Sequence, residues 1–421
     1  MKRISQCINA LQNGELKKAY TIIDEVKNKG MDEEKFALAE ELRGLGFLEE
    51  SQTLYKRLLE SHPGEGELLI ALAENYINLD QEHEAILALE QITKEDPFYV
   101  ESLLLQADLY QVQGLYEVSI QKLLEAEKIA PDEPVIQFAL AEMYYQTGKL
   151  HEAVYKYEQV LEHGDMIAGT NIYERLATVY STAGEFEKSL QYYEKALEGK
   201  LDINLLFGFG LSLYQAKYFK KAIEKLSEVI ELDPDYVGAY LPLAQAYEEE
   251  LMLDEALEIA EKGVEVNPLS KELHYCAGKL AVAKGDTKKA EEYFKKAIDI
   301  DPTYVDALLA YNQLLFSVDD YEKSLPLVET AIAEGEEDPF LLWDFAILCQ
   351  KNERYSDALN AYEKAYSYLK NHEQFLQDYG FFLLEEGIYS KAIEVFKQLR
   401  QFDPTNLEYV DVLERLESDE L

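Results

Sequence analysis

Apolar side chains recur along the chain at three- and four-residue spacing, in blocks of about a dozen residues. In the block over residues 67–79 they fall on one stripe of an α-helix, at Leu69, Leu72, Ala73 and Tyr76. A second stripe over residues 85–92 ends before Asp96-Pro97, and a proline cannot continue a helix. The pattern predicts helices that come in pairs.

The prolines give the period of this pattern. In two groups they lie 34 residues apart, and the intervals between the groups are close to three such steps: Pro63, Pro97, Pro131, Pro234, Pro268, Pro302 and Pro404. A period of 20–50 residues is typical of a repeat array, in which each unit packs on its neighbours. A turn residue between the two helices of a unit is often glycine, as at Gly114, Gly148 and Gly285, because glycine adopts the left-handed conformation that ends a helix.

Small residues recur in two columns. In the second helices the column is Ala or Ser throughout: Ala19, Ser51, Ala85, Ser119, Ala153, Ser189, Ala222, Ala256, Ala290, Ser324, Ala358 and Ala392. In the first helices it is Gly or Ala except at Asn312: Ala39, Ala73, Ala107, Ala141, Ala177, Gly210, Ala244, Gly278, Ala346 and Gly380. Helices approach closely only where side chains are small, so the columns predict where paired helices cross.

Together with the large residues around them, these columns resemble the tetratricopeptide repeat (TPR) family. Two units carry the resemblance best, Leu69-Leu72-Ala73-Tyr76-Ala85-Leu89-Pro97 and Gly278-Ala290-Phe294-Ala297-Pro302. It extends from Gly14 to Pro404. Length, acidity and repeat number also resemble the YpiA-type TPR proteins of Gram-positive bacteria. The resemblance implies an all-α fold: a TPR-type α-solenoid, a right-handed superhelix of about twelve antiparallel helix pairs. We expect a C-terminal capping helix over residues 406–416.

The period breaks once, between Val160 and Tyr173, where two residues are added and the Asp-Pro stop is missing. The break is either a hinge or a simple loop insertion, which a surface loop tolerates. We expect an N-terminal TPR segment over 1–164, a continuous C-terminal segment over 165–404, and a capping helix and tail over 405–421. Pro242 and Pro326 fall inside predicted helices, and each is expected to bend its helix.

The formal charge of −42 excludes the basic surface that a nucleic-acid binder needs and disfavours docking on anionic membranes. It favours neutral-to-basic polypeptide partners. The three scattered cysteines, Cys7, Cys276 and Cys349, fit neither a disulfide framework nor a zinc site, and they suit a reducing cytosol. We expect neither a secretory signal nor a membrane span, so the predicted location is cytoplasmic.

The sequence shows no motif for catalysis. The six histidines lie in different units without an HExxH pattern, which gives no support for a metal. The Gly208-Phe209-Gly210 run lies inside a predicted helix rather than after a strand, so it is not a phosphate-binding loop. We therefore expect no enzyme activity, no cofactor and no metal.

The resemblance to TPR proteins implies a concave face lined by the first helix of each unit. Transferred residue by residue, it predicts an aromatic and acidic groove for a partner, lined by Phe36, Glu74, Asp108, Phe138, Glu142, Tyr145, Phe207, Tyr214, Tyr275, Phe316 and Trp343. Alternatively, some of these side chains merely pack between units. The clamp by which some TPR modules hold an acidic chaperone tail is not matched, because Arg43, Arg175 and Lys279 are isolated.

Two classes of function remain open at this point. The first is a non-enzymatic scaffold or adaptor that binds a protein or peptide in the groove and presents it to another complex. The second is a peptide-sensing regulator or a hidden hydrolase built from TPR repeats. Self-association through exposed aromatic faces is a further outcome.

Overall fold

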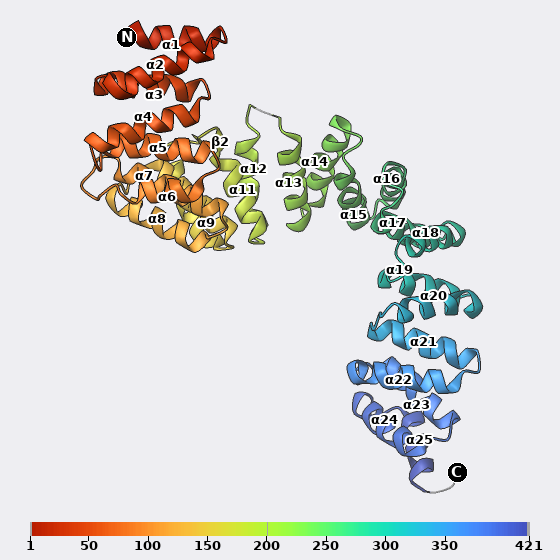
Figure 1. The fold of residues 1–421 in the computed structure, drawn as a ribbon. Coiled ribbons are helices and arrows are strands. Elements are labelled where there is room, and N and C mark those ends of the chain that lie inside the picture. The colour runs from red at the N-terminus through yellow and green to blue at the C-terminus, as the bar shows by residue number, and fades with distance from the viewer. Residues whose placement is uncertain (1, 200, 419–421) are drawn as a thin grey trace. The chain divides into compact units, whose positions relative to one another are not determined.

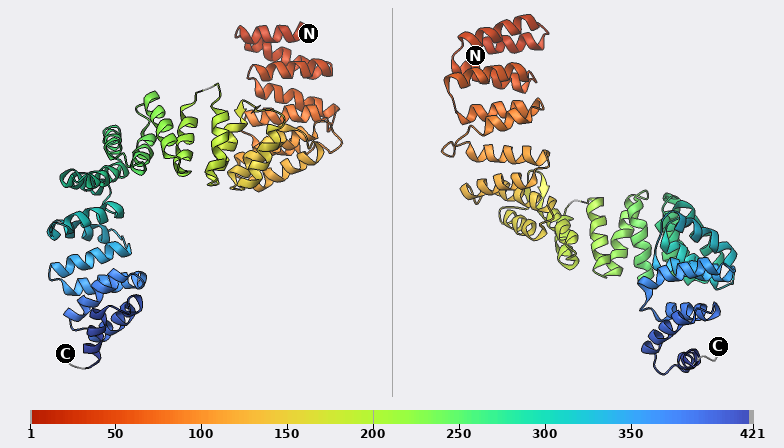
Figure 2. Two further views of the ribbon diagram at one scale, coloured as in Figure 1. Left: turned by 180° about the vertical axis from the view of Figure 1, so that it is seen from behind. Right: turned by 60° about the horizontal axis from the view of Figure 1, so that its bottom comes forward.

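The computed structural model describes residues 2–199 and 201–418, and these form two compact units, Met1–Leu201 and Asp202–Leu421. Each unit is built from six helix pairs (Figures 1 and 2). In unit 1 the pairs run in order: α1 Lys2–Gln12, α2 Leu16–Lys29, α3 Asp32–Gly44, α4 Leu48–Ser61, α5 Gly66–Asn78, α6 Glu82–Leu89, α7 Tyr99–Val112, α8 Tyr116–Ile129, α9 Pro134–Gln146, α10 Leu150–Leu161, α11 Ile172–Thr182 and α12 Phe186–Ala196.

Unit 2 continues the same order and ends with a single helix. Its elements are α13 Ile203–Gln215, α14 Phe219–Leu232, the short 3₁₀ helix η1 Val237–Ala239, α15 Tyr240–Glu249, α16 Leu253–Val266, α17 Lys271–Ala283, α18 Thr287–Ile300, α19 Val305–Phe316, α20 Tyr321–Ala333, α21 Pro339–Lys351, α22 Tyr355–Leu369, α23 Glu373–Glu385, α24 Tyr389–Phe402 and α25 Leu407–Glu417. The predicted all-α class, the twelve pairs and the final helix are confirmed.

Both small-residue columns lie in the core. All twelve Ala and Ser side chains of the second-helix column are at most 1% exposed. Cys7 in the short α1 completes the first-helix column, and its thiol lies 3.8 Å from the Ala19 carbonyl oxygen. At Gly278 the fit is closest, because a β-carbon there would lie 2.6 Å from the Phe294 ring. Small side chains at the crossings are therefore a steric requirement.

The turn inside each repeat has one conformation. The second residue after the first helix has a positive φ, and the next N–H donates to the carbonyl five residues earlier, as Glu15 does to Ala10 at 2.8 Å. This bond is the mark of a Schellman turn. Seven repeats have glycine at this position, and two have aspartate, Asp80 and Asp319. The other three have residues that carry no turn signal in the sequence: Lys217, Leu251 and Glu353.

The Asp-Pro or Asn-Pro pair between repeats also forms one local structure. The side-chain oxygen of the residue before proline accepts the N–H two residues later, over 2.8–3.3 Å at Asp96, Asp233, Asn267, Asp301 and Asp403. In three repeats a first-helix side chain then donates to the proline carbonyl: Gln137 to Pro131, Tyr240 to Pro234 and His274 to Pro268. These bonds fix where the next repeat begins.

The break in the period folds into a small hairpin within unit 1. Strand β1, Met166–Ile167, pairs antiparallel with β2, Thr170–Asn171, through a turn in which Ala168 and Gly169 have positive φ. The Asn171 side chain then caps α11 by accepting the N–H of Tyr173 at 2.9 Å. The hinge and the simple loop insertion stay alternatives, and the divisions 1–164, 165–404 and 405–421 stay predictions. Residues 419–421 of that predicted tail lie outside the described residues.

The two unusual prolines behave differently. Pro326 lies inside α20, as predicted. Pro242 is the third residue of α15, where no helical partner for its missing N–H exists, so the expectation that it bends a helix interior is wrong. At the C-terminal end α25 buries Tyr409, Val412 and Leu413 and exposes its charged side chains, which suits a cap.

Candidate functional site

The predicted partner-binding side chains lie on the first helices, and we call the surface that they share in each unit the first-helix face. Ten of the eleven are half-buried and one, Asp108, is exposed. Those in unit 1 are Phe36, Glu74, Asp108, Phe138, Glu142 and Tyr145, and those in unit 2 are Phe207, Tyr214, Tyr275, Phe316 and Trp343. Protein around the Asp108 carboxyl disfavours its charge and raises its pKa.

Three of the aromatic residues pack on the second helix of their own repeat. The rings of Phe36 and Tyr55, of Phe138 and Tyr157, and of Tyr275 and Phe294 each have centroids 6.2 Å apart. In every pair the partner follows nineteen residues later, so one contact recurs in three repeats. The first-helix ring is held in place by this contact and stays half-buried, which leaves part of its surface accessible.

Three other rings pack near the turns. Phe207 contacts Tyr236 with centroids 5.0 Å apart, Phe316 contacts Tyr321 at 5.2 Å, and Tyr214 contacts Phe219 at 5.6 Å. Part of the surface of these side chains therefore packs against other residues of the array, as the alternative interpretation of the sequence expects. Tyr145 instead lies with its hydroxyl 3.5 Å from Thr182 Oγ1.

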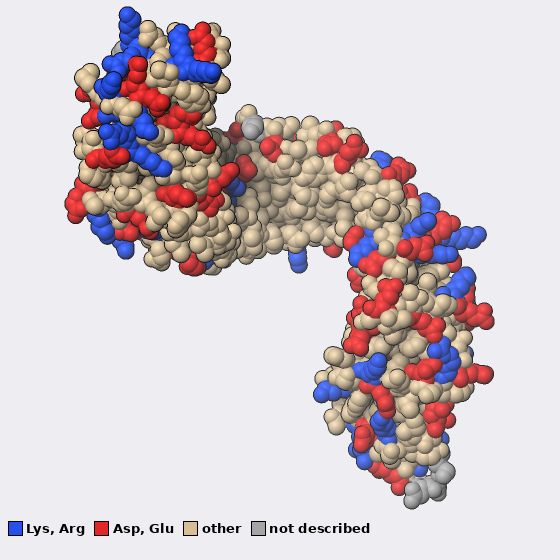
Figure 3. Space-filling model, in the orientation of Figure 1, with Lys and Arg blue, Asp and Glu red and all other residues tan. Residues whose placement is uncertain are grey.

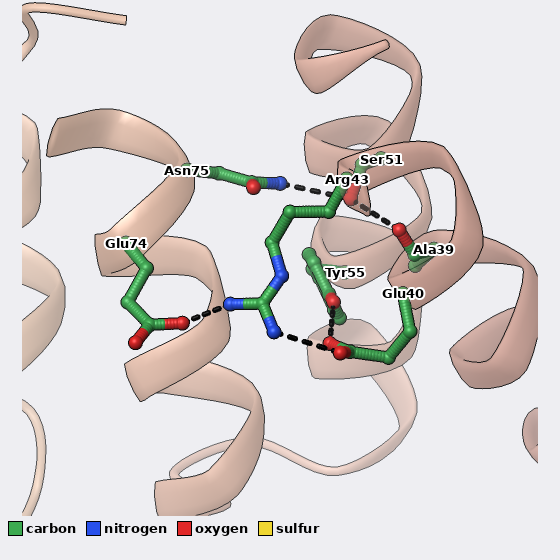
Figure 4. Close-up of polar contacts among 7 residues, drawn as sticks. All are labelled: Ala39, Glu40, Arg43, Ser51, Tyr55, Glu74 and Asn75. Carbon is green, nitrogen blue, oxygen red and sulfur yellow. Dashed lines mark hydrogen bonds and ion pairs between the residues drawn. The ribbon is translucent and has the colours of Figure 1, made fainter. Parts of the chain in front are cut away.

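Two of the three predicted acidic positions of unit 1, Glu74 and Glu142, pair with arginines of the same unit. Arg43 forms ion pairs with Glu40 of its own helix α3 and with Glu74 of α5, and the Tyr55 hydroxyl also donates to Glu40 (Figure 4). Burial and the hydrogen bond to Glu40 raise the pKa of Tyr55. Beside this cluster Asn75 donates to Ser51, and Ser51 donates to the Ala39 carbonyl at the helix crossing.

The same arrangement recurs around Glu142. Its carboxylate accepts the Tyr157 hydroxyl at 2.5 Å and pairs with Arg175 of the following first helix at 3.0 Å. In unit 2, Lys279 pairs with Glu248 at 3.1 Å. The arginines that look isolated in the sequence therefore neutralise two predicted groove carboxylates, Glu74 and Glu142. Such pairing reduces the negative field that a partner meets there.

Trp343 lies in a different environment, at the N-terminal ends of α21 and α23. Its Nε1–H donates to Asp378 at 3.1 Å, and its ring contacts those of Phe340, His372 and Phe375 with centroids 5.2–6.4 Å apart. Asp344, one residue on, accepts from Asn312 at 2.8 Å. Burial raises the pKa of Asp344 to about 7 and also raises that of Asp378.

Sequence reasoning missed Asp344 and Asp378. A signal was present, because the two lie 34 residues apart, each two residues before a small crossing residue, Ala346 and Gly380. With 82 acidic residues in the chain, that spacing did not stand out. Asn312, which departs from the small-residue column, is fully buried and accepts a hydrogen bond from Ser324.

Two hollows in the described part of the chain lie against second helices. One of about 520 Å³ is lined mainly by α18 residues and His274, and one of about 430 Å³ by Lys94 and residues of α8. Charged side chains line both, and His274 is already bound to the Pro268 carbonyl at 3.0 Å. In unit 2 the side of α13 seen in Figure 3 carries no charge, as α13 contains no charged residue.

Known tetratricopeptide repeat proteins match most of this chain in sequence. Family models match for YpiA-like tetratricopeptide repeats at residues 111–165, for YpiA-like C-terminal tetratricopeptide repeats at 339–406, and for tetratricopeptide repeats at 71–134, 170–198, 213–280 and 281–343. The TPR repeat-containing protein YpiA of Bacillus subtilis (strain 168) is 36% identical over 416 residues, which are 99% of this chain and 98% of that protein. The chain belongs to the YpiA-like TPR family.

More distant similarities extend beyond the YpiA-like family. The TPR repeat-containing protein MJ1428 of Methanocaldococcus jannaschii is 22% identical over 74% of this chain and 56% of that protein. Among solved structures, YrrB, described as a TPR protein with an unusual peptide-binding site, is 26% identical over 45% of this chain and 96% of that chain, with a TM-score of 0.39. The Cut9–Hcn1 structure covers 97% of this chain and 95% of that chain at 12% identity, also with a TM-score of 0.39.

No helix in the described part of this YpiA-like chain is long and apolar enough to cross a membrane. Within residues 2–199 and 201–418, no three His, Cys, Asp or Glu side chains form a group that could hold a metal ion. The three cysteine side chains are buried, and burial raises the pKa of each thiol.

Proposed function

We propose that this chain is a non-enzymatic scaffold that binds a polypeptide segment along its first-helix face. The observation that carries the proposal is the recurrence of half-buried aromatic side chains in equivalent places, with Phe36, Phe138 and Tyr275 each resting on a ring of the same repeat. A ring held on one side and accessible on the other supplies contact area at little entropic cost. Repetition along the face suits an extended chain or a helix.

The charge supports a neutral-to-basic partner. The chain carries 82 acidic and 40 basic residues, and many of the basic ones are already paired with carboxylates. A basic partner would gain from this field at long range, so we expect its affinity to fall as ionic strength rises. An unchanged affinity between low and high salt would remove charge from the proposal. A cytoplasmic location stays a prediction.

Site-specific photo-cross-linking tests where a partner binds. A benzophenone amino acid placed at Phe138 or Trp343 should give cross-linked adducts in cells, and mass spectrometry identifies them. The same probe at Tyr155 and Tyr368, which are 59% and 71% exposed on second helices, provides the matched controls. We expect adducts from the first pair and few from the second. Equal labelling at all four positions would contradict the proposal.

A turnover assay tests the non-enzymatic part. Phosphopeptides and unmodified peptides incubated with the purified chain should remain intact. If the chain hydrolyses a peptide, and substitution of one carboxylate abolishes the hydrolysis, the result would instead favour the second class of function, a peptide-sensing regulator or hidden hydrolase. Binding variants Phe138→Ala and Trp343→Ala should weaken partner capture, provided that their circular dichroism spectra match the unsubstituted chain.

A further inference from the structure

The N-terminal halves of α21 and α23 bring aromatic rings and the Asp378 carboxylate together on the first-helix face of unit 2, and Asp344 follows Trp343 in α21. The Trp343 and His372 rings meet edge to face with centroids 5.2 Å apart, and the Phe340 and His372 rings do so at 5.7 Å. Phe340 is 42% exposed, so this group of rings opens to solvent. The carboxylate of Asp378 lies on the indole edge, 3.1 Å from Nε1.

The carboxylates here lack the internal arginine that Glu74 and Glu142 of unit 1 have. Asp344 accepts from the Asn312 amide, and Asp378 accepts from Trp343 and from Gln374 at 3.2 Å. Among the described residues neither forms an ion pair with a lysine or an arginine, in contrast to Glu74 with Arg43 and Glu142 with Arg175. Hydrogen bonds from neutral amides and an indole orient these carboxylates, and apart from the His372 ring beside Asp378 no basic side chain offsets their charge in the described residues.

A bound cation would offset the free-energy cost of keeping these two half-buried carboxylates charged. Both carboxyls are half-buried, and burial disfavours the charged form, so their pKa values lie above the ordinary range. A positive group supplied from outside would restore the charged form, and the faces of the neighbouring rings attract cations as well. Arginine fits both features, because its planar guanidinium stacks on aromatic rings and donates to more than one carboxylate oxygen.

We propose that Phe340, Trp343, Asp344, His372 and Asp378 bind an arginine side chain of the partner polypeptide. We call this group the arginine site. The inference rests on the proposed function and adds where the partner binds and through which residue type. The partner's arginine docks in unit 2 on α21 and α23. There the chain itself does not supply a lysine or arginine to pair with the carboxylates. In unit 1 the chain itself supplies arginines, Arg43 to Glu74 and Arg175 to Glu142.

Trp343 is the single tryptophan of the chain, so its fluorescence reports directly on the arginine site. The probe is a nonapeptide of alternating leucine and arginine, compared with the same peptide carrying citrulline, which keeps the shape of arginine without its charge. At physiological salt the arginine peptide should change the Trp343 emission and bind at least ten-fold more tightly than the citrulline peptide. Equal affinities, or an unchanged emission on binding, would overturn the inference.

Substitutions distinguish binding of the arginine peptide at the arginine site from its general electrostatic attraction to an acidic protein. Asp344→Asn and Asp378→Asn should each weaken arginine-peptide binding several-fold, and together more. Asp411→Asn makes the same change in net charge on the exposed face of α25 and should have no comparable effect. If all three variants bind alike, the peptide binds elsewhere and the arginine site is wrong. The proposed function would then still be judged by the cross-links from Phe138, which lies in unit 1.

Discussion

At the scale of residues, the absence of side-chain atoms at the helix crossings decides how tightly a pair can pack. Gly278 shows this best, because an added β-carbon would lie 2.6 Å from Phe294, a ring that is itself 1% exposed. Since Phe294 is enclosed, it has little room to move away. Gly210 against Leu226 and Gly380 against Phe396 repeat the contact with distances of 2.8 and 3.0 Å. The large residue of the second helix and the small one of the first are therefore matched.

Gly278→Ala should lower the free energy of unfolding by about 1–3 kcal/mol, because overpacking of a closed contact outweighs the better helix propensity of alanine. Urea denaturation followed by circular dichroism measures the change. Gly44→Ala is the control, since nothing lies within 4 Å of a β-carbon at that helical position. It should leave stability unchanged or raise it slightly. Equal effects at the two positions would contradict the steric argument.

Asp344 gives stability an unusual dependence on pH. Its pKa is about 7 in the folded chain against an ordinary 3.8, so between these values the folded state holds a proton that the unfolded chain has lost. The contribution of Asp344 therefore favours folding at low pH and is lost as the pH rises toward 7. Asp344→Asn keeps an acceptor for Asn312 and should stabilise the chain by about 1–3 kcal/mol at pH 8.

The comparison of Asp344→Asn with the unsubstituted chain at pH 4 provides the control, because both folded proteins then carry a neutral side chain at position 344 and the unfolded Asp344 is close to its ordinary pKa of 3.8. Urea midpoints of the two proteins should converge at pH 4 and separate at pH 8. A difference that is constant with pH would mean that the Asp344 carboxyl titrates normally.

At the scale of elements, one turn geometry recurs in every repeat although its residues differ. The left-handed position is glycine in seven repeats, and it is Leu251 in the repeat of α15 and α16, with a φ of 59°. A β-carbon in this conformation is disfavoured. The hydrogen bond from Met252 to the Tyr247 carbonyl at 2.9 Å holds the turn closed in spite of this cost.

Leu251→Gly should raise the free energy of unfolding by about 1 kcal/mol, because Leu251 is 83% exposed and little packing is lost with its side chain. Gly285→Leu makes the reverse change at the equivalent turn, where the site is open, and should lower stability by a similar amount. Thermal or urea unfolding of the two variants measures both effects. The same sign for both would contradict the account.

The repeat elements could be predicted from sequence because their signals are periodic. The small columns, the Asp-Pro stops and the glycine turns each recur every 34 residues or so, and all appear in the structure where the spacing puts them. The turns at Lys217, Leu251 and Glu353 could not be predicted locally, since their conformation is imposed by the two packed helices rather than by the residue.

The candidate site was less predictable for a related reason. The pairing of Arg43 with Glu40 and Glu74 depends on the reach of long side chains between repeats, which column positions alone do not specify. The role of Asp344 depends on Asn312, a residue from the preceding first helix. Sequence position gave the face on which a side chain lies, but not whether its charge is already compensated.

At the scale of the whole molecule, the chain has no single core, and each repeat depends on its neighbours. Its last repeat is covered by α25, whose Tyr409 ring packs against Phe396 with centroids 6.2 Å apart. Tyr409 is 2% exposed, so much of the inner side of α25 is closed to water. Stability should therefore be distributed along the array and be lowest where a neighbour is missing.

A variant that ends at Thr405 lacks α25 and should exchange its backbone amide hydrogens faster in α23 and α24, because their apolar surface is uncovered. Unit 1 should exchange at an unchanged rate. Hydrogen exchange followed by mass spectrometry resolves the two regions. Faster exchange throughout the chain would show instead that the array unfolds as one cooperative body.

The match of Gly278 with Phe294 also restricts how such an array changes its length. A recombination event that placed an alanine-crossed first helix opposite Phe294 at the present spacing of α17 and α18 would produce a collision, whereas one that carried α17 and α18 together would keep both members of the match. The unit that recombination can add or remove without a steric mismatch is therefore the complete hairpin of two helices. Chimeras spliced at the Asp-Pro turns should fold, while those spliced inside a hairpin inherit mismatched crossings.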